Sequence, residues 1–204
     1  YYLNDLNQIK TLLLVIIAMS LLALGASWII QKANLIGNSK LPVIKTIPSF
    51  SLRTQDGNLF SESELNGKIT VLDFMFTSCL GPCPLMTHNM RKLYNQYRSK
   101  PDVQFVSITV DPIRDTEEML KQYALSNGVT DERWQFLTGE MDTIKSISQE
   151  GFLLFAESLP AGHAIKFVLI DHKGQIRKYY DGTDDTSMTT LQKDLDYFLK
   201  EFNS

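Results

Sequence analysis

A run of twenty residues without a charge lies near the start of the chain, at residues 11–30 (TLLLVIIAMSLLALGASWII). About 20 consecutive apolar residues are enough for a helix to cross a bilayer. Lys10 and Lys32 flank the run, and Trp28 lies near its far end, where aromatic side chains gather at membrane interfaces. The run is longer than the apolar part of a cleaved signal peptide, and no A-x-A-like site follows it. The pattern therefore predicts a single membrane-spanning anchor.

The same pattern divides the rest of the chain. Residues 1–10 are a short polar lead before the anchor. Residues 31–48 mix polar residues with glycine and proline, and we expect them to tether the anchor to a domain. In residues 49–204 apolar positions recur with regular periods, which indicates that this segment is the folded domain.

Within residues 49–204, a period of two predicts strands and a period of 3.6 predicts helices. Clusters of Gly, Pro, Asn and Asp mark the turns between them, such as Asp56-Gly57 in the first hairpin. The predicted strands cover residues 50–52, 58–60, 69–76, 103–110, 134–137, 165–171 and 175–180. The predicted helices cover residues 84–99, 116–126, 141–149 and 186–202.

The order of these elements predicts a thioredoxin-like α/β fold. Strand and helix alternate between residues 69 and 137, which indicates parallel strands joined by crossover helices. The last two strands, joined by a turn at residues 171–174, add an antiparallel hairpin. The full prediction is a thioredoxin-like fold with an N-terminal β-hairpin extension, preceded by one transmembrane helix.

Composition agrees with one domain plus an appendage. The chain has 204 residues, of which 44% are apolar and 21% are charged, and this is enough for one sizeable core. The formal net charge is −3 and no basic stripe occurs along the sequence. We therefore expect no nucleic-acid partner.

The two cysteines, Cys79 and Cys83, are the only ones in the chain and closely follow the predicted strand at residues 69–76. Two thiols this close can form a disulfide, exchange disulfides with another protein, or hold a soft metal. A C-x-x-C spacing is the usual one for exchange. The three intervening residues here leave room for both sulfurs to face one ion, so both kinds of chemistry stay open.

Two prolines, Pro82 and Pro84, bracket Cys83. Because a residue before proline is pushed out of the α region, we expect Gly81 and Cys83 to be extended. Residues 79–83 should then form a loop over the N-terminus of a helix that begins at Pro84. The positive end of the helix dipole would lower the pKa of both thiols.

Two thiolates are an incomplete shell for most metals, so we expect a histidine as a third ligand. His163 lies in a loop that, in a thioredoxin-like fold, faces the cysteine loop, and it is the candidate. His88 should point away, because five residues turn a helix by about 140°. His172 lies in a turn and should be exposed. Two thiolates and one imidazole suit copper, especially Cu(I), and also zinc.

Two acidic residues, Asp111 and Asp115, invite a metal-binding interpretation as well. Asp111 follows a strand end, and Asp115 stands at a predicted helix start, where acids are favoured by the helix dipole. We therefore expect ordinary structural roles for both carboxylates.

Three motifs and the anchor resemble the Sco/SenC family of membrane-anchored copper proteins. Residues 74–84 match the family pattern F-x-F-T-x-C-x-x-x-C-P, and residues 107–116 match S-x-x-V-D-P-x-R-D-T. Gly162-His163 and the strand at residues 167–171 resemble the family's ligand histidine and the strand after it. The resemblance extends over residues 47–202, essentially the whole domain.

The resemblance implies a thioredoxin-like fold and a copper site made of two cysteines and a distal histidine. Carried over by position, the ligands are Cys79, Cys83 and His163, and they would hold Cu(I) or Cu(II). The implied role is a metallochaperone that delivers copper to cytochrome c oxidase or matures its binuclear copper centre. Its partner would be the copper-accepting oxidase subunit or another respiratory-complex subunit. The domain of this single-pass inner-membrane protein would face the periplasm or the mitochondrial intermembrane space.

Two positions depart from the family pattern. Leu80 stands where the family has proline, and Gly162 stands where it has aspartate. The three ligand positions are kept, so the departures concern how the metal site is tuned rather than which residues form it. Loss of a nearby carboxylate is expected to change copper affinity, redox potential or docking.

Two other functions stay open. Cys79 and Cys83 could be the redox-active pair, able to form a disulfide, of a thiol–disulfide oxidoreductase that reduces the cysteines of a copper-accepting subunit. The chain could also be an anchored, non-catalytic accessory subunit of a respiratory complex. The oxidoreductase needs both cysteines but not His163, whereas the accessory subunit tolerates the loss of Cys79.

Overall fold

The computed structural model describes residue 10 and residues 14–28, 41–156, 159–160 and 162–202. The chain divides into two units, Tyr1–Leu41 and Pro42–Ser204. In the first unit, residues 14–28 form a helix with exposed side chains. Residues 11–13 and 29–30 of the predicted anchor lie outside the described residues. In the part of the chain that the structure describes, no helix is both long and apolar enough to cross a membrane.

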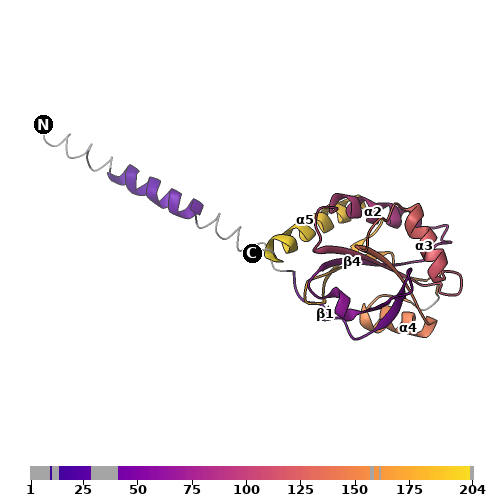
Figure 1. Ribbon diagram of the computed structural model, residues 1–204. Helices are drawn as coiled ribbons and strands as arrows, with labels where there is room; N and C mark the ends of the chain where they lie inside the picture. The colour runs from indigo at the N-terminus through magenta and orange to yellow at the C-terminus, as the bar shows by residue number, and fades with distance from the viewer. Residues whose placement is uncertain (1–9, 11–13, 29–40, 157–158, 161, 203–204) are drawn as a thin grey trace, which may run out of the picture. The chain divides into compact units, whose positions relative to one another are not determined.

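The second unit is built on an eight-stranded mixed sheet with the strand order β1-β8-β7-β4-β5-β6-β2-β3 (Figure 1). The strands are β1 (Lys45–Thr46), β2 (Ser51–Thr54), β3 (Leu59–Ser61), β4 (Ile69–Met75), β5 (Val103–Thr109), β6 (Trp134–Thr138), β7 (Lys166–Ile170) and β8 (Gln175–Asp181). The helices are α2 (Cys83–Gln96), α3 (Glu117–Ser126), α4 (Met141–Ser146) and α5 (Asp185–Phe202), with a 3₁₀ turn η1 (Glu62–Leu65) and a π-helical turn η2 (Ile147–Gly151).

Apart from β1, the predicted order of elements along the chain and the predicted strand directions are confirmed. β4, β5 and β6 are parallel and are connected through α2 and α3, while β7 and β8 form the antiparallel hairpin. The hairpin of β2 and β3 turns at Gly57, whose positive φ of 78° suits glycine. β2 then pairs with β6 and so joins the hairpin to the main sheet. The α/β, thioredoxin-like fold with an N-terminal hairpin is thus the observed one.

The sequence assigned residues 45–46 to the tether, and the structure makes them strand β1. Their partner is β8, with Lys45 opposite Ile176 and Thr46 opposite Gln175. Ile47, which follows, is buried in the core. A two-residue strand carries no period of its own, so only its pairing with a segment about 130 residues later reveals it.

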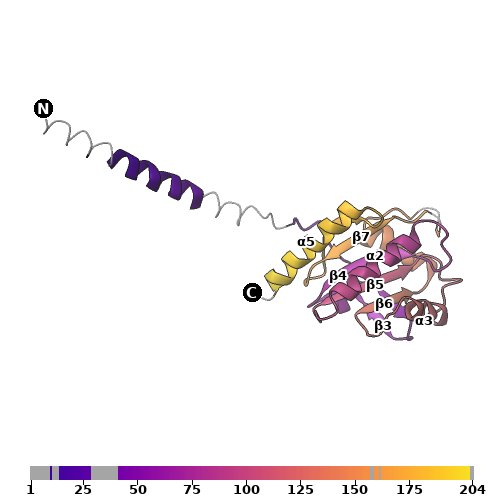
Figure 2. The same cartoon turned by 90° about the horizontal axis from the view of Figure 1, so that it is seen from above.

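Helices cover both faces of the sheet. Figure 1 shows α2, α3 and α5 over one face, with α4 on the other, and Figure 2 looks down on the face that α2, α3 and α5 cover. Tyr97, at the C-terminal end of α2, donates a hydrogen bond of 2.8 Å to the Asp196 carboxylate on α5. Beneath the opposite face, the ring of Phe152 packs edge-on against Phe74 of β4 at 5.5 Å between centroids.

β4 is the central strand, and all seven of its residues are buried. Asp73 on this strand accepts a 2.6 Å hydrogen bond from the Ser107 hydroxyl, which in turn accepts one from the Trp134 indole N–H at 3.0 Å. Burial raises the pKa of Asp73 to about 7, and the Ser107 hydrogen bond opposes that rise. The carboxyl group is therefore partly protonated at neutral pH.

Three connecting segments lie at the same edge of the sheet: two follow strands and one precedes a strand. β4 and β5 are parallel, with Met75 opposite Thr109, so the segments that follow both strands start side by side. β7 runs antiparallel to β4, with Phe167 opposite Asp73, so the segment that precedes β7 reaches this edge too. The cysteine loop, the segment after β5 and the segment that carries His163 therefore meet at one edge.

We expect Phe152→Ala to lower the free energy of unfolding by about 3–5 kcal/mol, because it opens a cavity against Phe74 in a closed core. Phe152 is 0% exposed, whereas Phe155 in the same segment is 58% exposed. Phe155→Ala is therefore the matched control and should change stability by about 0.5 kcal/mol or less. Urea denaturation of the two variants measures the difference, and equal losses would contradict this account of the core.

We expect Asp73→Asn to flatten the dependence of stability on pH. The pKa of Asp73 is about 7 in the folded chain and about 3.9 in an unfolded one, so the folded state binds the extra proton. The wild type should therefore lose stability as the pH rises from about 4 to 7, by roughly 4 kcal/mol in all. The variant has no such proton to lose. Denaturation curves at several pH values test this, and parallel profiles for the two proteins would refute it.

Candidate metal centre

The segment between β4 and α2 places Cys79 at the edge of the sheet. Phe76, Thr77 and Ser78 lead out of the strand, and the backbone N–H of Cys79 donates back to the Phe76 carbonyl at 3.3 Å. The N–H of Gly81 approaches the Cys79 sulfur at 3.4 Å. Cys79 is half-buried, while Leu80 at the tip of the loop is fully exposed.

Cys83 lies in the first turn of α2 and not in the preceding loop. Pro82 is the N-cap, with φ −75° and ψ −22°, and Cys83 is the first helical residue. The expectation that Cys83 is extended and that the helix begins at Pro84 is wrong. The bias of a residue before proline is only a preference, and a proline within the first helical turn leaves no backbone bond unmade there. The helix start buries Cys83, which is 1% exposed.

His163 lies in the segment before β7, the antiparallel neighbour of β4, and its side chain reaches the two cysteines. A single antiparallel bridge pairs it with Ala156, and its ring stands edge-on to that of Phe76, with 5.7 Å between the centroids. Its Nδ1–H donates to the carbonyl of Ala164 at 3.3 Å. This bond leaves the Nε2 lone pair free to face the sulfurs.

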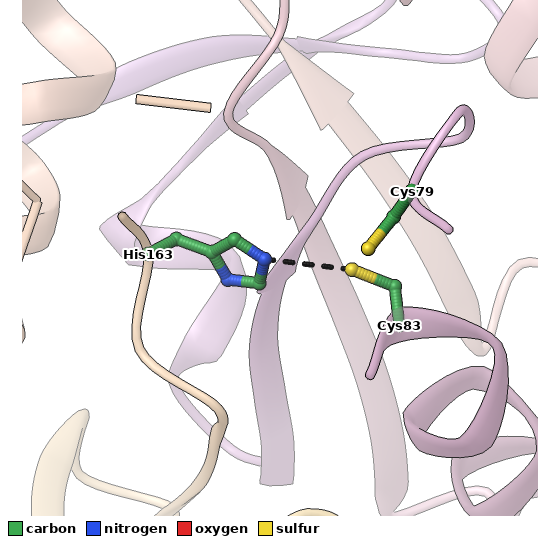
Figure 3. A group of neighbouring side chains, drawn as sticks. All are labelled: Cys79, Cys83 and His163. Carbon is green, nitrogen blue, oxygen red and sulfur yellow. Dashed lines mark hydrogen bonds between the residues drawn. The ribbon is translucent and has the colours of Figure 1, made fainter. Parts of the chain in front are cut away.

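The structure brings together the three residues that the sequence singled out as ligands (Figure 3). The sulfurs of Cys79 and Cys83 and a ring nitrogen of His163 all lie within 4.8 Å of one another. His163 Nε2 is 3.4 Å from the Cys83 sulfur. In the part of the chain that the structure describes, no other group of three His, Cys, Asp or Glu side chains converges in this way.

Burial sets the protonation of this group. Burial raises the pKa of the Cys83 thiol to about 12, with further rises from its hydrogen bond with Cys79 and from the negative charge of Asp73. The expected lowering of this pKa by the helix N-terminus is therefore overturned for Cys83, because desolvation outweighs the dipole. Burial also lowers the pKa of His163. Without metal, Cys83 is a thiol and His163 is a neutral imidazole that accepts its S–H.

The three side chains fit a soft metal ion. Donors bound to one ion at about 2.0–2.3 Å lie about 3.5–4.5 Å apart, so only a small closure of the group is needed. Two sulfurs and one imidazole match the donor preferences of copper, and zinc accepts the same set. Because the ligands must be deprotonated, binding releases the Cys83 proton, and affinity falls as the pH falls.

The other two histidines lie away from this group. His88 is exposed on α2 and contacts Arg91 at 3.3 Å, as predicted for a residue that points away from the loop. His172 is half-buried rather than exposed, because its ring packs against Phe202 of α5 at 5.1 Å. The turn at residues 171–174 indicated exposure, and only the docking of the last helix reverses it.

Sequence reasoning missed the role of Asp115. Thr116, the first residue of the helix predicted at residues 116–126, is the N-cap of α3, and its hydroxyl accepts from the Met119 N–H at 3.3 Å. The Asp115 side chain, however, is turned inward and accepts hydrogen bonds from Thr77, next to the cysteine loop, and from Thr109. The available signal was that Thr77 and Asp115 are both fixed positions of the two matched motifs.

The family model, the related sequences and the solved structures that match this chain all point to one family. The model of the SCO1/SenC family matches residues 39–197. The SCO1 protein homolog of Bacillus subtilis is 29% identical over 163 residues, which cover 76% of this chain and 84% of that protein. The family-model match extends over the whole sheet and includes all three residues of the candidate metal centre.

Solved structures agree in fold. A SCO1/SenC family lipoprotein from Bacillus anthracis has a TM-score of 0.72 at 34% identity, covering 78% of this chain and 98% of that one. BsSco, described as a member of the Sco family of cytochrome c oxidase assembly proteins with a disulfide switch, has a TM-score of 0.68 at 28% identity, with coverages of 76% and 94%. Copper-bound ScoI of Arabidopsis thaliana has a TM-score of 0.63 at 25% identity, with coverages of 76% and 100%. With a family model matched over more than half of its length, the chain belongs to the SCO1/SenC family.

Proposed function

We propose that this protein is a copper metallochaperone that delivers copper to cytochrome c oxidase or matures its binuclear copper centre. The observation that carries the proposal is the convergence of the Cys79 and Cys83 sulfurs with His163 Nε2. Two relatives support it: a copper-bound ScoI, and BsSco of the cytochrome c oxidase assembly family. The partner is then the copper-accepting oxidase subunit or another subunit of a respiratory complex.

The chemistry follows from the three side chains. Cys79 and Cys83 supply thiolate sulfurs, and each thiol releases its proton when the ion arrives. His163 is already neutral, with Nε2 unprotonated, so it binds without losing a proton. Copper is the cargo, held as Cu(I) or Cu(II). The exposed loop tip at Leu80 and Gly81 leaves one side of the site open to a partner protein.

Exchange of copper rather than permanent storage fits this arrangement. Three donors leave the coordination shell of the ion incomplete, so a ligand of the acceptor can enter before the donors leave. The raised pKa of Cys83 favours reprotonation of this thiol as the ion departs. A buried thiol with a neutral imidazole beside it can therefore release copper without leaving an unpaired buried charge.

We further propose that residues 11–30 anchor the protein in the inner membrane, with residues 49–204 facing the periplasm or the mitochondrial intermembrane space. The uncharged run of twenty residues supports the anchor. The Bacillus anthracis relative is a lipoprotein, and two yeast relatives are mitochondrial. A tethered domain would keep its metal site near membrane-embedded respiratory complexes.

A second candidate function is thiol–disulfide exchange by the same pair of cysteines. The closeness of the two sulfurs, within 4.8 Å, favours it. One thiolate would attack a disulfide of the copper-accepting subunit, and the second would resolve the mixed disulfide. The pair ends as a Cys79–Cys83 disulfide, and the partner gains two electrons and two protons as two thiols.

We expect the purified, reduced protein to bind about one copper per chain. Cys79→Ser, Cys83→Ser and His163→Ala should each weaken Cu(I) binding at least about tenfold, because each removes one donor of a three-donor site. His88→Ala is the matched control, since His88 is exposed and outside the group. Competition with a chromophoric chelator measures affinity, and elemental analysis gives the stoichiometry. Wild-type affinity in His163→Ala would remove His163 from the site.

The same variants separate the two candidate functions. A copper chaperone loses activity when His163 is replaced, whereas an exchange catalyst keeps the reduction of a partner disulfide. Retained exchange activity in His163→Ala, together with loss in Cys79→Ser, would favour the oxidoreductase. If the respiratory complex still assembles and works with Cys79→Ser, only the role of a non-catalytic accessory subunit would remain.

We expect the full chain to sediment with membranes and to resist extraction by high salt and by alkaline carbonate. A chain shortened to residues 42–204 should stay in the supernatant, because it lacks the uncharged run. Immunoblots of fractions from expressing cells check both. Release of the full chain by salt alone would contradict the proposed anchor.

A further inference from the structure

A buried carboxylate outside the candidate metal centre is bonded to the base of the cysteine loop. Asp115 lies between β5 and α3 and is 0% exposed. One of its oxygens accepts from the hydroxyl of Thr77 at 2.5 Å. The other accepts from the backbone N–H of Thr77 at 3.0 Å and from the hydroxyl of Thr109 at 2.5 Å. Three donors from two segments thus converge on one side chain.

These bonds hold the chain where it leaves β4. Thr77 is two residues before Cys79, and Asp115 binds both its backbone N–H and its hydroxyl. Phe76, directly before Thr77, contacts the ring of His163 and accepts the N–H of Cys79 through its carbonyl. Holding Thr77 in place therefore also holds Phe76 and Cys79, and so sets the position of Cys79 relative to His163. Asp115 acts on this geometry through Thr77.

The hydrogen bonds of Asp115 fix the position of Thr77 and do not pair the carboxylate with a cation. The neighbouring Arg114 turns away and pairs with Asp111 at 3.0 Å. Asp115 is tied to the same segment through its backbone N–H, which donates to the Asp111 carbonyl at 2.8 Å. Within the described residues, no cationic side chain forms a salt bridge with Asp115. Its carboxylate is held by the Thr77 and Thr109 hydroxyls and the Thr77 N–H, and these directional hydrogen bonds fix the position of Thr77. We call Asp115 with these two threonines the clamp.

Topology explains why the clamp is available. β4 and β5 are parallel neighbours, so Thr77 and the segment from Asp111 to Asp115 emerge side by side. Beyond Thr77 the loop is exposed at Ser78, Leu80 and Gly81. Its hydrogen bonds there are local, from the Cys79 N–H to the Phe76 carbonyl and from the Gly81 N–H to the Cys79 sulfur. An exposed loop that carries a ligand needs a fixed base if its ligand is to keep its place.

We infer that Asp115 is a positioning residue: through Thr77 it holds the cysteine loop so that the Cys79 sulfur faces Cys83 and His163. The inference for copper rests on the proposed function. The same clamp also sets how readily the two sulfurs meet in a disulfide, which needs a specific approach of the two cysteines. A metal-free measurement therefore tests the clamp independently of copper.

The conservative variant Asp115→Asn separates geometry from charge. Its amide oxygen can take the place of the oxygen that accepts from the Thr77 N–H and the Thr109 hydroxyl. Its NH₂ group can then donate to the Thr77 hydroxyl, which is able to accept as well as donate. Asn keeps the clamp and removes the charge, whereas Asp115→Ala removes both.

A carboxylate between α5 and β8 provides the matched control. Asp194 accepts from the Tyr180 hydroxyl at 2.7 Å and from the Lys178 ammonium at 2.9 Å. Asp194→Ala therefore also breaks a partly buried network, but one that contains no residue of the cysteine loop. It reports how much of any effect comes from a general loss of stability.

The experiment uses the full-length chain in detergent, at a temperature where circular dichroism shows every variant to be folded. Two quantities are measured: the Cu(I) affinity by competition with a chromophoric chelator, and the equilibrium constant of the Cys79–Cys83 disulfide against glutathione in metal-free protein. We expect Asp115→Ala to lower the affinity tenfold or more and to shift the disulfide equilibrium at least fivefold. Asp115→Asn should recover both to within about threefold of wild type, and Asp194→Ala should leave both unchanged.

Each alternative outcome has a distinct meaning. Wild-type values for Asp115→Ala, or equal changes in Asp194→Ala, would overturn the positioning role. Failure of Asp115→Asn to restore either quantity would overturn it too, because the effect would then come from charge. If the wild type binds no copper, the proposed function fails. A disulfide equilibrium shifted in Asp115→Ala and restored in Asp115→Asn would still establish the clamp.

Discussion

The burial of β4 between β5 and β7 is the constraint on which the rest of the molecule depends. Every residue of this strand is buried, so its register with both neighbours is set by packing on two faces. Because β5 is parallel and β7 antiparallel to it, three connections emerge at one edge. The cysteine loop, the clamp at Asp115 and the segment of His163 are therefore neighbours by topology, although up to 84 residues separate them along the chain (Cys79 to His163).

The same burial decides the chemical state of the site. A thiol at a helix N-terminus would ordinarily be acidified, yet removal of Cys83 from water raises its pKa instead. His163 is kept neutral for the same reason, and Asp73 beneath them holds its proton to near neutral pH. The metal-free site therefore contains a Cys83 thiol beside a neutral His163 imidazole, and it gives up the Cys83 proton when a metal ion binds.

Local patterns predicted the elements well because their causes are local. Apolar periodicity identified the central strands and the crossover helices, and Thr116 capped α3 as its position indicated. One local expectation failed, since α2 begins at Cys83 and not at Pro84. The other failures lie where a distant partner decides the outcome. β1 exists only through β8, His172 is covered only when α5 docks, and the inward turn of Asp115 depends on Thr77 across two strands.

The sequence alone determined the fold class, the two thiols and a histidine suited to complete their shell, because residue type and spacing carry this information directly. Only the tertiary structure decided how these groups meet. It places the two sulfurs and a ring nitrogen of His163 within 4.8 Å, buries Cys83 and ties Thr77 to Asp115. The physical reason is that distances, desolvation and hydrogen-bond partners between segments far apart arise only when the sheet assembles around β4.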